Sequence, residues 1–138
     1  MECPLSALAD AANVSADGKL NILGEFDTIY SLGGEPIVHP SMVFVAKLRV
    51  SAGELGEHTV QLRVVDDDMH LVRIVIVGKM NFVRVGVPGV EGAFQIVVPV
   101  QLAEFPGFGS YRFQLLVDDL VVCAPEVHVR RPPQTAAG

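Results

Sequence analysis

Residues 109–119 constrain the fold of this chain more than any other segment, because their side chains alternate between apolar and polar with a period of two. Successive side chains of a β-strand point to opposite faces, so this alternation buries one face and leaves the other to water. The apolar side chains are Tyr111, Phe113, Leu115 and Val117. The other face carries Arg112, Gln114 and Asp118, with Leu116 as its apolar exception. Turn residues flank the segment on both sides, which predicts a strand of an antiparallel sheet.

Short apolar segments recur along the rest of the chain between turn signals. The expected strands comprise residues 5–14, 19–26, 42–50, 59–66, 71–77, 80–85, 94–102, 111–117 and 121–129. Asp17-Gly18 is a hairpin signal, and Gly78 is expected to end or bulge its strand. Pro99 cannot donate to a β-ladder, so its strand is expected to lie at a sheet edge or to carry a bulge. Eight or nine strands at this spacing predict an all-β, two-sheet antiparallel β-sandwich, Ig-like or C2-like, with a barrel as the alternative.

Alternation inside the other segments predicts which side chains form the core. The inward-facing residues are expected to be Leu20, Ile22, Phe26, Met42, Phe44, Ala46, Leu48, Val50, Val60, Leu62, Val64, Phe94, Ile96, Val98, Val100 and Leu102. Residues 5–12 are rich in Ala and Leu, and propensity alone favours a helix there.

Composition limits the classes of partner and compartment. Sixteen acidic against ten basic residues give a net charge of -6, which disfavours nucleic-acid binding. The apolar run near residues 72–77 is interrupted by Arg73 and too short for membrane insertion. The N-terminal residues lack the charge and apolar run of an export signal, so a cytoplasmic protein with Cys3 and Cys123 as reduced thiols is expected. One domain over residues 1–130 is expected, with a disordered, Pro-rich tail over 131–138.

Several motifs resemble those of a bacterial domain family of unknown function. They are ADAANV at residues 9–14, DGKLNILGEFD at 17–27, HPSM at 39–42, GEHT at 56–59 and the strand at 109–119. The resemblance covers about residues 5–129 and implies a small β-sandwich whose first element is a β-hairpin, which favours strand over helix at residues 5–12. It implies no activity, ligand or catalytic residue. The sequence departs from the family at Asp118-Asp119, where Asp-Gly is usual, and in the very apolar stretch 71–100.

Few residues suggest chemistry. Two acidic turns, Asp66-Asp67-Asp68 and Asp118-Asp119, are weak candidates for a Ca²⁺ site if they lie at one end of a sandwich, although acidic residues are also common in hairpin turns. The four histidines lack the spacing of a zinc site, and Ser110 lacks that of a nucleophile elbow. No cofactor and no catalytic residue is therefore expected, and a small-ligand or calcium-binding sandwich remains the alternative function.

Excess apolar surface is the strongest functional signal. In residues 71–77 and near 97–99 both faces of the expected strands are apolar, whereas a sandwich buries one face of each sheet. A cover is needed, which could be residues 27–41, a second copy or another protein. The interface candidates are Val72, Val75, Val77, Val97 and Pro99. The sequence thus predicts a non-catalytic interaction or assembly module that self-associates.

Overall fold

The computed structural model describes residues 1–34, 36–83 and 92–134. In the described residues the secondary structure is almost entirely β. The strands are β1 (Glu2–Val14), β2 (Leu20–Phe26), β3 (Thr28–Tyr30), β4 (Ile37–Val50), β5 (Gly56–Asp66), β6 (Leu71–Phe82), β7 (Gly92–Phe105), β8 (Gly109–Val117), β9 (Leu120–Cys123) and β10 (Glu126–Arg130). The helical segment in this part of the chain is a single turn, Ala52–Glu54, which is far too short to cross a membrane.

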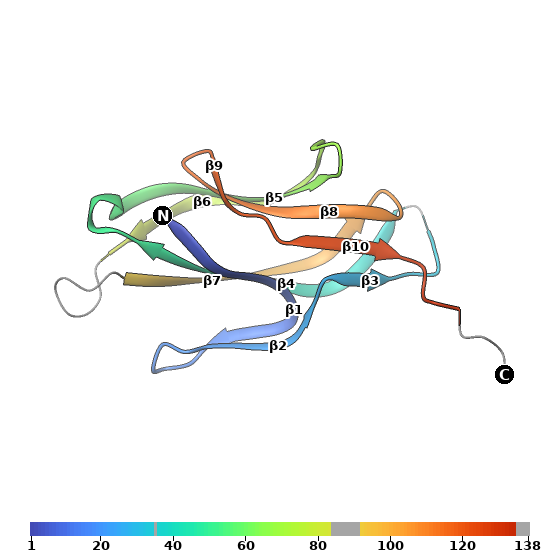
Figure 1. Cartoon of the computed structure of the whole chain (residues 1–138), viewed down its shortest axis with the longest axis horizontal. Coiled ribbons are helices and arrows are strands. Elements are labelled where there is room, and N and C mark those ends of the chain that lie inside the picture. Colours follow the sequence, from blue (N-terminus) through green and yellow to red (C-terminus); the bar gives the residue numbers. More distant parts are fainter. Residues whose placement is uncertain (35, 84–91, 135–138) are drawn as a thin grey trace.

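The strands form two sheets that pack face to face, which confirms the expected β-sandwich (Figure 1). One sheet has the order β2-β1-β4-β7, and the other has six strands in the order β3-β10-β8-β5-β6, with β9 paired to β8. The core between them is built from the alternating side chains of β4, β5 and β8, as their sequences predict. Its largest fully buried side chains include Phe44, Phe82, Phe105 and Phe113.

Most expected strands are present, but some of their limits differ. The prediction that Gly78 ends or bulges its strand is wrong, since β6 continues to Phe82 and Gly78 pairs directly with Val60. Residues 27–41, which separate two of the expected strands, contribute β3 and the start of β4. Pro125 divides the last expected strand into β9 and β10, and β7, which contains Pro99, is an edge strand as predicted. The last residues of the expected tail, 135–138, lie outside the described part.

Near one end of the four-stranded sheet, the residues of β7 that face the core change from even-numbered to odd-numbered. Val100 is 1% exposed, but Leu102, expected in the core, is 63% exposed, and the next buried residue is Ala103. Leu102 has a positive φ of 50°, which turns the strand so that odd-numbered residues face inward beyond it. The partner strand β4 makes the same change, from Met42 to Ile37, which are both buried. Period-two alternation cannot continue through such a change, so the prediction for Leu102 is wrong.

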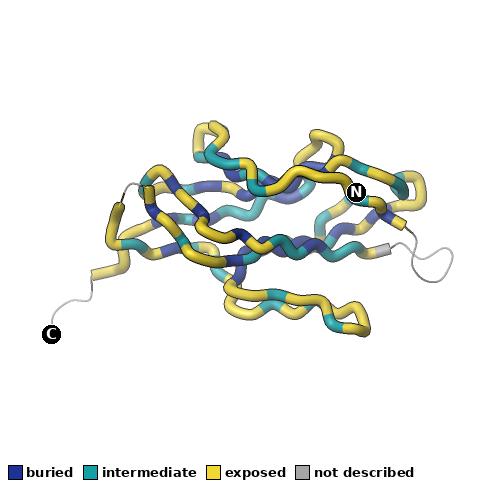
Figure 2. The backbone as a smooth tube through the Cα atoms, turned by 180° about the vertical axis from the view of Figure 1, so that it is seen from behind, coloured by how far each residue is buried: buried dark blue, intermediate teal, exposed yellow. Residues whose placement is uncertain are grey.

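The first hairpin leaves its sheet and forms a third layer. Pairing of β1 with β4 ends at Ala9, beyond which residues 10–25, here called the arm, pair only within the hairpin. Figure 1 shows the arm below the four-stranded sheet, and Figure 2 shows most of it exposed. The side-chain amide of Gln95 donates a hydrogen bond of 2.9 Å to the Gly18 carbonyl at its tip. On the outer face of β4, Val45 is 0% exposed although it lies outside the main core, so the arm covers this face.

The arm also changes the place of two residues expected in the core. Leu20 and Ile22 are only half-buried, because the part of β2 that precedes Phe26 belongs to the arm and does not face the other sheet. Phe26 itself packs against the core as predicted. Strand rather than helix at residues 5–12 is confirmed by β1.

The two cysteines join the two sheets. Cys3 of β1 and Cys123 of β9 form a disulfide, with their Cα atoms 6.1 Å apart. The expectation of two reduced thiols is therefore wrong for this structure. The sequence separation of 120 residues hides this pairing from local patterns, because only the folded topology brings β1 and β9 together.

Candidate functional site

The outer face of the six-stranded sheet is apolar along β6 and has no covering layer in the described structure. Val60, Leu62 and Val64 of β5 face the core, so the residues between them face outward. Opposite these outward residues, β6 presents three apolar side chains. They are Leu71, Ile74 and Val77, which are 55%, 48% and 59% exposed. We call these three residues the β6 stripe.

The polar side chains beside the stripe are paired with one another. Arg63 donates a hydrogen bond of 2.9 Å from Nε to Oε1 of Gln114, which is only 3% exposed. Two surface ion pairs, Lys79–Glu57 at 3.5 Å and Arg112–Glu126 at 3.4 Å, neutralise most of the remaining charge. The centre of the face therefore carries paired polar side chains beside the buried apolar residues Val65 and Leu116, with an exposed apolar margin at β6.

The five sequence-predicted interface residues do not lie on one surface. Val72 and Val75 are half-buried and pack against the core, and only Val77 belongs to the β6 stripe. Val97 and Pro99 lie on the outer face of the other sheet, where they pair with Val45 and Val43 of β4. Two register shifts between β5 and β6, after Leu62 and after Val64, exchange the faces of β6. Simple alternation therefore misses Leu71 and Ile74 as members of the exposed face.

The free edge of β6 is less suitable for pairing than its face. Both register shifts distort the strand, and Arg73 crosses to β7, where its Nη1 donates to the carbonyl of Leu102 at 3.0 Å. Lys79 adds a charge near the other end of the strand. Bulges, lysines and inward-pointing charges are the usual means by which edge strands avoid pairing with other chains. Contact through the face is thus more accessible than strand addition.

The two acidic turns lie at opposite ends of the six-stranded sheet. Asp66 pairs with Tyr111 at one end of β8, whereas Asp118 follows the other end. The structure therefore does not bring Asp66, Asp67 and Asp68 together with Asp118 and Asp119, as a shared calcium site requires. Asp118 and Asp119 instead form the β8–β9 turn, both with a positive φ.

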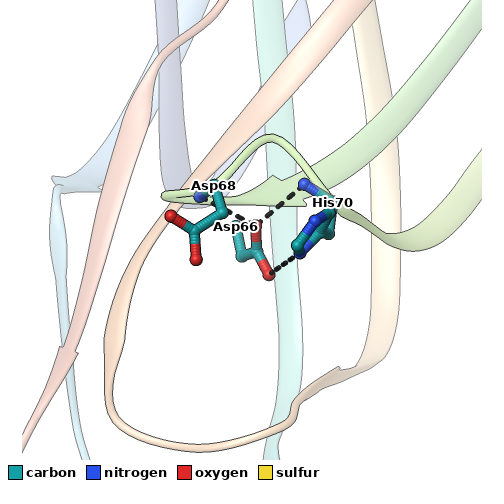
Figure 3. A group of neighbouring side chains, drawn as sticks. All are labelled: Asp66, Asp68 and His70. Carbon is teal, nitrogen blue, oxygen red and sulfur yellow. Dashed lines mark hydrogen bonds and ion pairs between the residues drawn. The ribbon is translucent and has the colours of Figure 1, made fainter.

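One acidic turn does contain three potential metal ligands. Ligand atoms of Asp66, Asp68 and His70 lie within 4.8 Å of one another (Figure 3). However, Oδ1 of Asp66 already accepts hydrogen bonds from the backbone N–H groups of Asp68 and His70, at 3.0 and 2.8 Å. These bonds are those of an aspartate that stabilises a turn. Three ligands also fall short of the six or more oxygens that Ca²⁺ takes.

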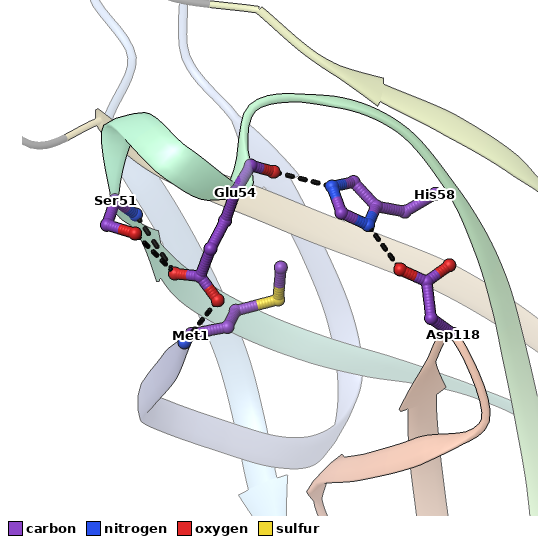
Figure 4. Close-up of polar contacts among 5 residues, drawn as sticks. All are labelled: Met1, Ser51, Glu54, His58 and Asp118. Carbon is purple, nitrogen blue, oxygen red and sulfur yellow. Dashed lines mark hydrogen bonds and ion pairs between the residues drawn. The ribbon is translucent and has the colours of Figure 1, made fainter.

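A second polar cluster lies at the opposite end of the six-stranded sheet, where it connects the start of β5 to the end of β8. Nδ1 of His58 lies 2.5 Å from Oδ2 of Asp118, and Nε2 faces the Glu54 carbonyl (Figure 4). The Asp118 carboxylate and then this carbonyl raise the pKa of His58, while His58 and the Thr59 N–H lower the pKa of Asp118. The ammonium group of Met1, 2.6 Å away, and then Ser51 lower the pKa of Glu54 to about 2.

The geometry of this cluster is that of side chains that hold neighbouring strands together. A cavity of about 280 Å³ lies beside it, but the side chains that line it include no hydroxyl or thiol that could act as a nucleophile. Both imidazole nitrogens of His58 already face acceptors, so the ring is held in place and is not free to take a proton from a substrate. The cluster therefore connects the η1 turn, β5 and the β8–β9 turn.

Ser110 and His128 form a cross-strand bond rather than a catalytic pair. Oγ of Ser110 lies 2.7 Å from Nδ1 of His128 on the outer face of β8 and β10. The other imidazole nitrogen is 3.8 Å from Glu126, too far for a hydrogen bond, and Glu126 also faces Arg112. No carboxylate in the described structure thus orients this imidazole as a base.

Comparison with known proteins gives one match. The model of a family of unknown function, DUF6941, matches residues 4–130, almost the same span as the resemblance seen in the sequence. Neither a curated protein nor a solved structure matches the chain significantly.

Proposed function

Because the chain belongs to the DUF6941 family, whose function is unknown, we propose its function from the structure: it is a non-catalytic interaction module that self-associates through the outer face of its six-stranded sheet. The observation that supports this most is the contrast between two sheet faces. The protein covers the outer face of the four-stranded sheet with its own arm, but leaves the β6 stripe about half exposed. Contiguous exposed apolar surface of this kind usually marks an interaction site.

Charge favours a second copy as the occupant of this face. Of the charged residues beside the stripe, Lys79 and Arg112 are paired with Glu57 and Glu126, which leaves Arg63 as a single net positive charge. The whole chain carries -6, and most other surfaces of two copies repel each other. Two copies can therefore approach most closely through this face, and a two-fold arrangement lets the same patch serve both.

Sedimentation velocity of matched variants tests the proposal. Ile74→Asp places a carboxylate within the β6 stripe, and Leu23→Asp makes the same change on the arm, where Leu23 is 72% exposed. We expect the unmodified chain and Leu23→Asp to sediment as a multiple of 14.8 kDa, and Ile74→Asp to sediment as a folded monomer. A monomeric unmodified chain would contradict the proposal, as would equal dissociation of both variants. Circular dichroism confirms that Ile74→Asp remains folded.

A cytoplasmic location also belongs to the proposal. In that compartment thioredoxin and glutathione keep most thiols reduced, whereas the structure joins Cys3 and Cys123, so the redox state of this pair in cells tests the location. Alkylation of acid-quenched cells with a mass-tagged reagent distinguishes the two states. Two tagged cysteines support a cytoplasmic location, and none would contradict it.

A further inference from the structure

A concave surface with two arginines lies where β8 begins and β10 ends. It is an open depression of about 510 Å³, and its lining consists of Phe108, Gly109, Ser110, Val129, Arg130 and Arg131. The guanidinium of Arg131 lies over the ring of Phe108, 5.0 Å from its centroid, and Phe108 is 43% exposed. An aromatic ring and two cationic groups therefore face the same hollow, which we call the arginine groove.

The cations of this groove are not neutralised by the described part of the protein. Arg112, on the neighbouring stretch of β8, pairs with Glu126 at 3.4 Å. By contrast, no described carboxylate lies within ion-pair distance of Arg130 or Arg131. In a chain with six more acidic than basic residues, such a pair of exposed arginines is a local exception to the charge of the surface. A negatively charged ligand is attracted to this place and repelled from most others.

The surroundings of the groove favour an extended ligand with apolar side chains. Tyr30 lies directly opposite Arg130 in the β3–β10 pair and is 57% exposed, so a second aromatic ring continues the surface across the sheet. A Cβ at Gly109 would meet no atom within 4 Å, which leaves the backbone at the groove open. The acidic turn at Asp66 lies at the same end of the sheet but on the other side of β8. Because the carboxylates of this turn repel negative charge, an acidic ligand is expected to lie over β10 and β3.

We propose that the arginine groove binds an acidic, extended peptide segment of a partner protein. Carboxylates of the segment contact Arg130 and Arg131, whose planar guanidinium groups suit two-point hydrogen bonding, and an apolar side chain packs on Phe108. The continuous phosphate backbone of a nucleic acid would also meet the acidic surface around the groove, so a short peptide fits the charge pattern better. This inference rests on the proposed role as an interaction module and names the chemistry of its partner.

Fluorescence anisotropy with a labelled peptide of alternating Glu and Phe tests the proposal, with a Gln and Phe peptide as the neutral counterpart. The variant Arg130→Gln/Arg131→Gln removes the two groove cations. Its control, Lys47→Gln/Arg49→Gln, removes two cations from the outer face of β4. We expect saturable binding of the acidic peptide alone, weakened about tenfold by the groove variant and less than about twofold by the control, in keeping with the loss of charged hydrogen bonds. Phe108→Ala should weaken binding without changing its dependence on salt.

Three results would overturn the proposal. They are equal binding of the acidic and neutral peptides, equal loss in both double variants, and tighter binding of a single-stranded oligonucleotide than of the acidic peptide. The mass of the groove variant separates this inference from the proposed self-association. A monomeric wild-type protein that binds the peptide would support the groove and contradict self-association. A groove variant that loses both the peptide and its partner copy would assign Arg130 and Arg131 to the self-association surface and contradict the groove.

Discussion

The outer faces of the two sheets begin from similar sequence patterns and end in different environments. Val45 of β4 and Val77 of β6 are both valines that point away from the core, yet Val45 is 0% exposed and Val77 is 59% exposed. Val45 lies on an internal strand beneath the arm, whereas Val77 lies on the edge strand β6, over which the arm does not fold. An apolar outward face is therefore no sign of an interface until the rest of the chain has been placed, because another segment can cover it.

The arm and the face beneath it depend on each other. A two-stranded hairpin is at best marginally stable alone, so the arm needs contact with the four-stranded sheet. The sheet in turn uses the arm to remove Val45 from water. On the six-stranded sheet no described segment performs this task, and its apolar margin remains available to a second copy. The following changes test this contrast.

The largest effect is expected from the link between the two sheets. Cys3→Ser/Cys123→Ser removes a disulfide that closes a loop of about 120 residues. Because the disulfide lowers the conformational entropy of the unfolded chain, its removal should reduce the unfolding free energy by about 5 kcal/mol. We expect this loss in denaturant unfolding of the oxidised protein, and no further loss when reductant is added to the variant. Equal stability of the oxidised wild type and the double variant would show that the two cysteines are not joined in solution.

The paired valines compare the two faces directly. Val45→Ala leaves a space under the arm and should lower the unfolding free energy by about 2 kcal/mol, since the side chain is fully buried. Val77→Ala should change the stability of the monomer by less than about 0.5 kcal/mol, as is usual for exposed sites. Chemical denaturation at low protein concentration measures both. Equal costs at the two positions would mean that the arm does not cover Val45.

The root of the arm offers a smaller and more local perturbation. Gly24 has a φ of +70°, and a Cβ at this position would collide with the Asp10 carboxylate. Gly24→Ala should therefore cost about 1–2 kcal/mol. Hydrogen exchange should show faster exchange in the arm, with β5 and β8 protected as before. The control is Gly18→Ala at the tip, where φ is also positive but no atom lies nearby. Similar exchange in both variants would contradict a specific fit at the root.

The smallest expected effect is the dependence of stability on pH, which is compared between the His58–Asp118 pair and Asp17 at the tip of the arm. The raised pKa of His58 gives stability that is full below its unfolded value of 6.5 and is lost as pH rises through the folded value. The lowered pKa of Asp118 gives stability that is full above 3.8 and is lost as pH falls through its folded value. The pair thus contributes most between these two values. Asp118→Asn should flatten the decline in melting temperature above pH 6.5, whereas Asp17→Asn on the exposed arm tip should not.

Local alternation was sufficient to predict the centre of the sandwich. The inward faces of β5 and β8, and of β4 from Met42 to Val50, follow the sequence because the extra residues at the register shifts lie on their partners β1, β6 and β9 and leave the pleat of these three strands unbroken. Tyr111 is inward as predicted, and its hydroxyl donates to the Gly107 carbonyl at 2.7 Å. In such strands the period of two is enough to decide which side chains are buried.

The features that position the candidate site depend on long-range pairing. The register shifts opposite Leu62 and Val64 become visible only when β5 and β6 are paired, and they decide which residues of β6 face outward. The arm covers Val45 because β1 leaves the sheet after Ala9, although its sequence shows no proline there. Sequence period indicates which side chains share a face, but it does not say which other segment covers that face.

The most direct test of the central claim is a distance measurement between copies. A spin label at Val77→Cys lies on the β6 stripe, and a label at Leu23→Cys lies on the arm, both at exposed positions. We predict dipolar coupling between labels on two copies that is strong at Val77 and weaker or absent at Leu23, and that disappears when Ile74→Asp is introduced into the labelled chain. Absence of coupling at Val77, or stronger coupling at Leu23, would contradict self-association through the outer face of the six-stranded sheet.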